Sequence, residues 1–221
     1  MTTADVFVPL IERWLPAYGV TAGGATRERM ARYLALVREA NRRVRIVGDS
    51  EPELLVRRHL CESLYLAALV PLAGQRLVDV GSGAGFPGLA LALGEWDLKT
   101  TLVESTGKKA GLLGWMVAEL GLTGRVEVRQ ERLGRAERRR GQPLRADWVT
   151  VRAVERMAEV PTWLGAWMAP GAQAAFWVTA SLDARWRAHA GWEWSAFAAL
   201  PGSRERGIVR AVPRGTSRGS R

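Results

Sequence analysis

The hydrophobic positions of the first 72 residues recur every three or four residues, as they do on one face of a helix. This spacing predicts a helix that begins with Thr26 as its N-cap and runs to about Arg43. A second predicted helix opens with a capping box at Ser50–Glu53 and runs to Val70. Residues 1–72 are therefore expected to form a helical extension without strands.

From Arg76 onward, short apolar runs alternate with amphipathic segments. The pattern predicts strands at 76–80, 99–104, 125–129, 146–151 and 173–178, helices at 87–94, 107–120, 131–140 and 155–168, and two weaker strands, 194–199 and 206–212, which could pair as an antiparallel hairpin. Such alternation is typical of an α/β fold with a doubly wound, mostly parallel sheet. We assign residues 73–212 to this domain and expect residues 213–221 to be a disordered basic tail.

A glycine turn follows the first of these strands. The strand ends at Asp79-Val80, and Gly81, Gly83 and Gly85 then precede Phe86. A strand, a glycine turn and a helix bring backbone N–H groups against a nucleotide-like ligand. A dinucleotide site needs its third glycine where this chain has Phe86. With the acid Asp79 inside the strand, this spacing favours S-adenosylmethionine over NAD; the alternative is a glycine-rich surface loop.

A second acid, Glu104, ends the next predicted strand, about 20 residues past the glycine turn. A nucleotide-binding βαβ unit places a carboxylate there for the ribose hydroxyls. The carboxylate would repel a phosphorylated ribose, which counts against NADP. Although a solvated strand-end glutamate is the alternative, the glycine turn makes a ribose contact the favoured interpretation.

The composition limits the class of protein. Hydrophobic residues make up 48% of the chain, which is typical of a globular protein, and no apolar run reaches the roughly 18 residues of a membrane helix. The N-terminus lacks the pattern of a signal peptide, so we expect a cytoplasmic protein. The single cysteine, Cys61, excludes an internal disulfide and a cysteine-rich zinc site, and its helical spacing predicts a core residue. We expect no metal.

The chain carries a net charge of +10, almost all of the positive charge being arginine. A GC-rich genome could explain arginine in place of lysine, but it does not explain the surplus. A surplus of this size favours a polyanionic partner, nucleic acid before membrane. Arginines are also frequent in residues 125–145. They could form a solvated helix face or a surface that faces RNA. Of the tryptophans, we expect Trp186, Trp192 and Trp194 to be partly exposed and the others to be core.

The motifs together resemble glucose-inhibited division protein B, the bacterial 16S ribosomal RNA guanine-N7 methyltransferase G family, over about residues 25–212. The landmarks are Asn41, Arg58-His59, Glu62-Ser63, the loop from Asp79 to Gly88, Glu104-Ser105, Lys108-Lys109, Arg132, Arg152-Ala153 and Glu205-Arg206. The Gly-Phe-Pro-Gly end of the loop is the most specific piece, because most methyltransferases lack it.

The resemblance implies a class I methyltransferase fold with an N-terminal helical extension. It implies that S-adenosylmethionine lies over Gly81–Phe86, with its ribose on Glu104 and its adenine beside Leu133-Gly134. Arg152 would lie near both the methyl donor and the target guanine, as the catalytic residue. Arg58, Lys108, Lys109 and Arg206 are the residues that we expect to contact RNA.

The leading hypothesis is therefore S-adenosylmethionine-dependent methylation of guanine N7 in 16S ribosomal RNA. N7 carries a lone pair and no proton, so the reaction needs placement rather than a general base. His59 is then a structural residue, and Arg152 donates to the guanine or a phosphate, unless it pairs with Glu155. The partner would be the RNA or an assembling small subunit, and the protein a monomer.

Two other hypotheses stay open. One is a small-molecule methyltransferase, which the arginine surplus argues against. The other is a S-adenosylmethionine- and RNA-binding regulator that has lost activity. It stays open because the chain departs from the family pattern, with Gly134 in place of glutamate and Thr179 in place of lysine. Further departures are Glu62 in place of aspartate and Arg45-Ile-Val47 in place of Asn-Leu-Thr.

Overall fold

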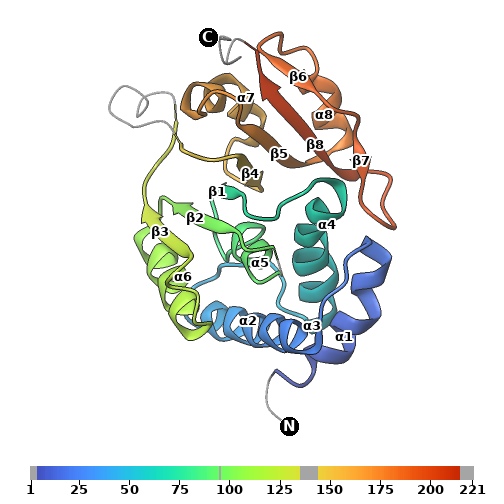
Figure 1. Ribbon diagram of the computed structural model, residues 1–221, viewed down its shortest axis with the longest axis vertical. Coiled ribbons are helices and arrows are strands. Elements are labelled where there is room, and N and C mark those ends of the chain that lie inside the picture. The colour runs from blue at the N-terminus through green and yellow to red at the C-terminus, as the bar shows by residue number, and fades with distance from the viewer. Residues whose placement is uncertain (1–3, 95, 135–143, 215–221) are drawn as a thin grey trace.

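The computed structural model describes residues 4–94, 96–134 and 144–214. Helices form the N-terminal part of the chain (Figure 1). They are α1 (Phe7–Trp14), the 3-10 helix η1 (Leu15–Tyr18), α2 (Gly24–Arg43), α3 (Pro52–Leu54), the π-helical segment η2 (Leu55–Cys61) and α4 (Glu62–Leu69). The last three follow one another without interruption, so the helix expected from about 50 to 70 is present, with a π-helical stretch inside it.

Both predicted helix caps are wrong. Helix α2 begins at Gly24 with Gly23 at its N-cap, whereas Thr26 is buried in the first turn and its Oγ1 accepts a hydrogen bond from Arg29. Helix α3 is capped by Glu51, whose carboxylate accepts from the backbone N–H of Leu54 at 3.0 Å. Any side-chain oxygen that reaches this N–H satisfies it, and here the carboxylate does so.

The strands are β1 (Arg76–Val80), β2 (Lys99–Glu104), β3 (Val126–Gln130), β4 (Trp148–Arg152), β5 (Gln173–Thr179), β6 (Trp192–Trp194), β7 (Ala198–Ala199) and β8 (Arg206–Pro213). They form one sheet in the order β3-β2-β1-β4-β5-β8-β6, with β7 also paired to β8. Strands β1 to β5 are parallel, and β8 is antiparallel to β5. The predicted doubly wound, mostly parallel α/β sheet is confirmed.

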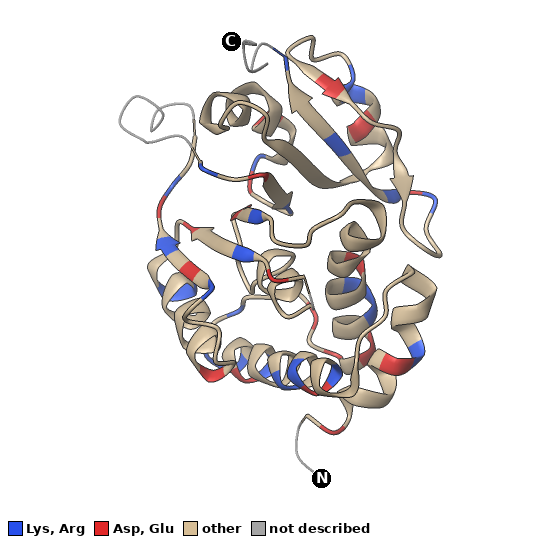
Figure 2. Cartoon of the chain, in the orientation of Figure 1, with Lys and Arg blue, Asp and Glu red and all other residues tan. Residues whose placement is uncertain are grey.

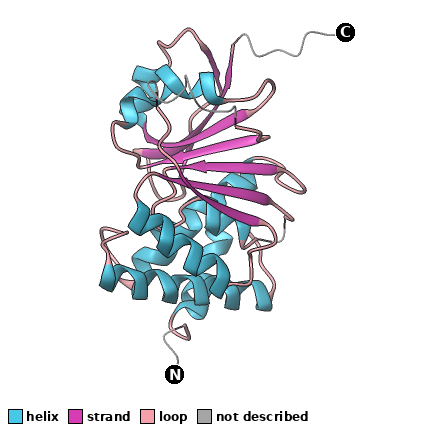
Figure 3. Ribbon diagram, turned by 90° about the vertical axis from the view of Figure 1, so that its left-hand side faces the viewer, coloured by secondary structure: helices cyan, strands magenta, loops and turns pink. Residues whose placement is uncertain are grey.

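Helices cover both faces of this sheet (Figure 3). The remaining helical segments are α5 (Gly88–Ala92), α6 (Gly107–Glu119), η4 (Met157–Glu159), α7 (Val160–Trp163), η5 (Leu164–Trp167) and α8 (Ala180–Trp186). Successive strand residues point to opposite faces. Leu77 therefore joins an apolar core with Tyr33 of the N-terminal helices, while Val78 joins a second core with Trp167.

Several predicted elements differ from the structure. The single helix expected at 155–168 is three short helices, and Pro161 lies in the first turn of α7, where its missing N–H is tolerated. Of the helix expected at 131–140, residues 131–134 are irregular and the rest lies outside the described residues. Helix α8 was not predicted; Thr179 caps it by accepting from the N–H of Leu182.

The C-terminal strands also differ. The strand expected at 194–199 is two strands, β6 and β7, and each pairs with β8 rather than with the other. Pro213, expected in the tail, ends β8, and residues 215–221 lie outside the described part of the chain. None of the described helices is long and apolar enough to cross a membrane.

Two of the tryptophans expected to be partly exposed belong to the core. Trp186 and Trp192 are buried around Phe176, while Trp194 keeps partial exposure. The indole N–H of Trp186 donates to Ala158 O, and that of Trp192 to Pro161 O. The predicted exposure of Trp186 and Trp192 is therefore wrong. Their polar neighbours in the sequence suggested exposure, but backbone carbonyls of the helices between β4 and β5 accept the indole N–H bonds inside the core.

Candidate active site

The glycine turn after β1 lies where the strand order reverses between β1 and β4, the usual ligand position in such sheets. Gly81, Gly83 and Gly85 have φ of 73°, 55° and 97°, a region that favours glycine. A Cβ on Gly81 would lie 2.3 Å from Val154 Cγ1, and one on Gly85 would lie 2.8 Å from Leu89 Cβ. Both the conformation and the close packing therefore require glycine here.

Glu104 ties the end of β2 to this turn. One of its carboxylate oxygens accepts from the N–H of Gly83 at 3.0 Å and the other from the N–H of Thr106 at 2.8 Å. The side chain is largely buried, yet it lines the cleft described below. Each carboxylate oxygen has further acceptor capacity, so Glu104 can still accept from the hydroxyls of a diol.

Asp79 lies beneath the turn rather than in the cleft. It is fully buried, and Thr150 Oγ1 donates to it at 2.7 Å. Burial raises the pKa of Asp79 to about 6, against the effect of its hydrogen-bond donors, which lower it. A Cβ on Gly88 would lie 2.5 Å from Asp79 Cβ, so Gly88 allows the start of α5 to pack directly on this carboxyl group. The geometry gives Asp79 a supporting position.

The N-terminal helices hold the turn from the other side. The hydroxyl of Tyr33 in α2 donates to Ala84 O at 2.9 Å, and its ring lies 5.2 Å from that of Phe86. The His59 ring, from η2, lies 5.1 Å from Phe86. Burial, with Arg152 and Arg58 nearby, lowers the pKa of His59 to about 4, so its imidazole is neutral at pH 7. His59 therefore packs against the end of the glycine turn and also lines the cleft described below.

A cleft of about 1040 Å³ opens above the turn, at the carboxyl ends of the parallel strands. Its lining includes the turn itself with Glu104, the segments 46–48 and 131–134, His59, Lys109, Arg152 to Arg156, Glu159, Thr162 and Trp163. Pockets for small molecules commonly span about 300–1,000 Å³. The cleft is therefore large enough for a nucleoside-sized cofactor and part of a second substrate.

The segment that carries Leu133 and Gly134 forms one wall of this cleft. The indole N–H of Trp167 donates to Gly134 O at 3.0 Å and fixes the segment against η5. Trp163, three residues past the start of α7, lines the cleft from the same side. No local pattern predicted a role for Trp163 or Trp167, because their role depends on where η5 packs.

Arg152, at the end of β4, lines the cleft but points its donors at the N-terminal helices. Its guanidinium donates to Glu62 at 2.9 Å, to Ser63 Oγ at 3.2 Å and to the backbone oxygens of Arg58 and His59. Arg152 therefore forms its ion pair with Glu62, and not with Glu155 as the alternative interpretation had it. Burial lowers the pKa of Arg152, and the Glu62 carboxylate opposes this shift.

The Glu62 carboxylate links the N-terminal helices to the sheet next to the cleft. It is buried in α4, and it pairs with Arg206 of β8 as well as with Arg152. Its backbone oxygen also accepts from the indole N–H of Trp177 at 2.7 Å. A buried carboxylate between two arginines is satisfied as a group, and loss of one member leaves an unpaired charge.

The four residues expected to contact RNA do not form one cluster. Lys109 lines the cleft, Lys108 is exposed next to it at the start of α6, and Arg58 is exposed on η2. Arg206 is about one-third exposed and is paired with Glu62.

Other arginines are paired with acids. Three arginines of α2 form ion pairs, Arg27 with Glu12, Arg32 with Glu119 and Arg43 with Glu39. Figure 2 shows basic and acidic positions alternating along this helix. In the basic stretch 125–145, Arg129 pairs with Glu127, and residues 135–143 lie outside the described part.

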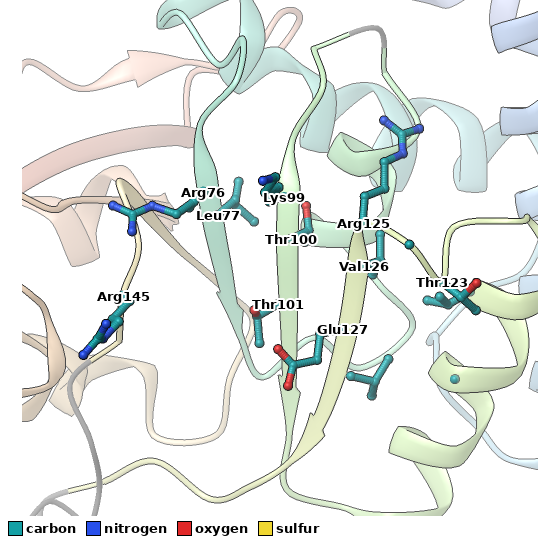
Figure 4. Close-up of a pocket in the computed structure, with 14 residues that line it drawn as sticks. Arg76, Leu77, Lys99, Thr100, Thr101, Thr123, Arg125, Val126, Glu127 and Arg145 are labelled. Atoms are coloured by element: carbon teal, nitrogen blue, oxygen red, sulfur yellow. The ribbon is translucent and has the colours of Figure 1, made fainter.

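A second hollow, of about 570 Å³, lies at the opposite ends of β1, β2 and β3 (Figure 4). Arg76, Lys99 and Arg125 mark the starts of the three strands there. The Arg76 guanidinium is occupied by Asp147 at 2.9 Å. The amino ends of parallel strands are not where α/β sheets bind ligands, so the cleft above the glycine turn is the candidate active site.

The described residues contain no group of three or more histidine, cysteine or acidic side chains that could hold a metal. Cys61 lies in the core as predicted, and burial with the nearby Glu62 raises the pKa of its thiol to about 12. The thiol is therefore protonated and unreactive.

The sheet order, the glycine turn at the switch point and the carboxylate at the end of β2 define the class I S-adenosylmethionine-dependent methyltransferase fold. The fold is shared with the M1A22 tRNA methyltransferase TrmK of B. subtilis, at a TM-score of 0.53 and 15% identity over 70% of this chain and 67% of that one.

The sequence places the protein more narrowly. Residues 26–189 match the GidB family, described as rRNA small subunit methyltransferase G, and the chain belongs to this family. A ribosomal RNA small subunit methyltransferase G of Sorangium cellulosum is 42% identical over 146 residues, 65% of this chain and 60% of that protein. One of Methylococcus capsulatus is 37% identical over 153 residues, 69% and 71% of the two chains. This chain spans 49% to 60% of the length of the first four curated relatives that it matches.

Proposed function

We propose that this protein transfers the methyl group of S-adenosylmethionine to N7 of a guanine in 16S ribosomal RNA. The observation that carries the proposal is the cleft at the switch point, with the glycine turn and Glu104 on one side and room for a second substrate beside them. Membership of the GidB family supports the choice of RNA as that substrate. The net charge of +10 supports a polyanionic partner.

The cofactor fits the residues that are present. Gly81 and Gly83, both with positive φ, line the cleft with no side chain of their own. Glu104 would accept from the ribose hydroxyls, and the Leu133-Gly134 segment held by Trp167 would lie beside the adenine. Asp79 would support the turn from below, and Gly81 to Phe86 would lie under the cofactor.

When bound, S-adenosylmethionine supplies an electrophilic methyl group on a positively charged sulfur. The N7 lone pair bonds to the methyl carbon while the carbon–sulfur bond breaks and its electron pair stays on sulfur. N7 loses no proton, so no side chain must act as a base. The protein's contribution is then placement of N7 in line with the methyl group.

Arg152 is the residue that we expect to act on the target guanine. It lines the cleft next to the turn, and its guanidinium is held by Glu62 and Ser63. Four of its five N–H groups donate to the N-terminal helices, so the Nε–H is the donor that we propose for guanine O6 or a phosphate of the target nucleotide. Arg58, Lys108, Lys109 and Arg206 would contact the RNA around the cleft. We place the reaction in the cytoplasm, with a monomer acting on the RNA or on an assembling small subunit.

A deletion strain tests the proposal. Small-subunit RNA from this strain should lack one N7-methylguanosine that the parent strain contains, and a plasmid copy of the gene should restore it. An Arg152→Ala copy should fail to restore it while the purified variant still binds S-adenosylmethionine. An unchanged N7-methylguanosine content in the deletion strain would refute the proposal in favour of a small-molecule substrate or an inactive regulator.

A further inference from the structure

The wall of the cleft that faces away from Glu104 comes from the N-terminal helical part of the chain. Ile46, Val47 and Gly48, from the loop after α2, line the cleft, as does His59 from η2. Phe86, which ends the glycine turn and would lie under the cofactor, packs against the His59 ring and so borders both walls. The cofactor, as proposed above, occupies the turn, Glu104 and the Leu133-Gly134 wall, so this second wall is left for the other substrate.

One side chain fixes the loop in place. The side-chain oxygen of Asn41, the only asparagine in the chain, accepts from the N–H of Ile46 at 2.8 Å and from the N–H of Val47 at 3.0 Å. Asn41 lies in the last turn of α2, so both bonds tie the loop to the end of a 20-residue helix. Without the Asn41 oxygen, the N–H groups of Ile46 and Val47 lose the hydrogen bonds that hold the loop to α2.

The chemistry of this wall suits a planar base. Ile46 and Val47 are apolar, and the rings of His59 and Phe86, which contact each other at an interplanar angle of 37°, carry no charge. In an RNA helix N7 faces the deep, narrow major groove, which side chains do not reach, and enzymes commonly hold an unstacked target base between apolar and aromatic side chains. Methylation at N7 leaves a positive charge on guanine, which an uncharged aromatic face accommodates and a charged imidazole would repel.

We infer that residues 46–48, His59 and Phe86 form the pocket for the extruded target guanine, and that Asn41 is the positioning residue that shapes it. The inference rests on the proposed function and deepens it. It also gives the N-terminal helices a role, because they supply the substrate side of the cleft while the sheet supplies the cofactor side.

The first test compares Asn41→Leu with Asn41→Asp, since aspartate keeps an acceptor oxygen and leucine does not. For Asn41→Leu we expect at least a tenfold loss of kcat/KM for RNA, because small misplacements of reacting groups cost up to about 100-fold. The Kd for S-adenosylmethionine should change less than twofold. Hydrogen exchange at the Ile46 and Val47 amides should be faster in Asn41→Leu, whereas Asn41→Asp should keep most of the activity and slow exchange.

A second pair of variants stands apart from Asn41 and from folding. A Cβ on Gly48 meets no atom within 4 Å, so Gly48→Trp can add bulk to this wall without strain at the Cβ. The matched control is Gly124→Trp, which is equally open but lies in the hollow at the other end of the sheet. Gly48→Trp should lose RNA methylation at least tenfold and keep cofactor binding, and Gly124→Trp should keep both.

The outcomes separate the two proposals. If the wild-type protein methylates no guanine, the proposed function fails and the inference falls with it. If the wild type is active and Gly48→Trp or Asn41→Leu is equally active, the inference alone is overturned. Equal losses of cofactor affinity and transfer would also overturn it, since the wall would then belong to the cofactor.

Discussion

His59 and Asp79 should change the free energy of unfolding in opposite directions as the pH falls. His59 titrates at about 4 in place of 6.5, and Asp79 titrates at about 6 in place of 3.8. Each pKa unit corresponds to about 1.36 kcal/mol. Each group is therefore worth about 3 kcal/mol of pH-dependent stability, with opposite sign.

The sign follows from which state takes up the proton. Between pH 6.5 and 4 the unfolded chain protonates His59 and the folded protein does not, so His59 costs stability as the pH falls. Between pH 6 and 3.8 the folded protein protonates Asp79 before the unfolded chain does, so Asp79 adds stability as the pH falls. In the wild type the two contributions nearly cancel.

Urea unfolding of the wild type, His59→Gln and Asp79→Asn, at intervals from pH 8 to pH 4, isolates each contribution. Only the difference between variant and wild type at each pH matters, so changes in packing enter as a constant. From pH 6.5 to pH 4, His59→Gln should gain about 3 kcal/mol relative to wild type, and Asp79→Asn should lose about 3 kcal/mol. Differences that stay flat, or that move in the same direction, would refute the burial argument for both residues.

Three further changes test the site. Glu104→Gln should weaken binding of S-adenosylmethionine about tenfold or more in calorimetry, because a charged acceptor for the ribose becomes a neutral one; unchanged affinity would remove Glu104 from the site. Glu62→Gln should lower the free energy of unfolding by about 3–5 kcal/mol, since two arginines lose their buried partner; a loss under 1 kcal/mol in urea unfolding would contradict that. Gly88→Ala should cost about 1–3 kcal/mol or more through its clash with Asp79, and a melting temperature equal to wild type would show that the contact relaxes freely.

Local patterns predicted much of the fold. Strands β1 to β5 and helices α2 and α6 follow from short apolar runs and helical spacing, and the glycine turn follows from its own residues. Helix α8 and the broken helix at 155–168 were missed because packing around Pro161 and the Trp186 core outweighs the local spacing.

Long-range pairs could not be read from the chain. Glu62 meets Arg152 and Arg206 across separations of 90 and 144 residues. The sequence named all three residues through a family resemblance, but it offered Glu155 as the partner of Arg152. Asn41 was likewise named without a role, because its two hydrogen bonds depend on how the loop after α2 folds back.

The proposed reaction is the transfer of a methyl group, in the cleft, to N7 of a guanine in 16S ribosomal RNA. The most direct test incubates the purified protein with trideuteromethyl S-adenosylmethionine and small subunits from the deletion strain, followed by mass spectrometry of the digested nucleosides. We expect one N7-methylguanosine per RNA that is heavier by the three deuterium atoms. Label on no nucleoside, or on a position other than guanine N7, would contradict it.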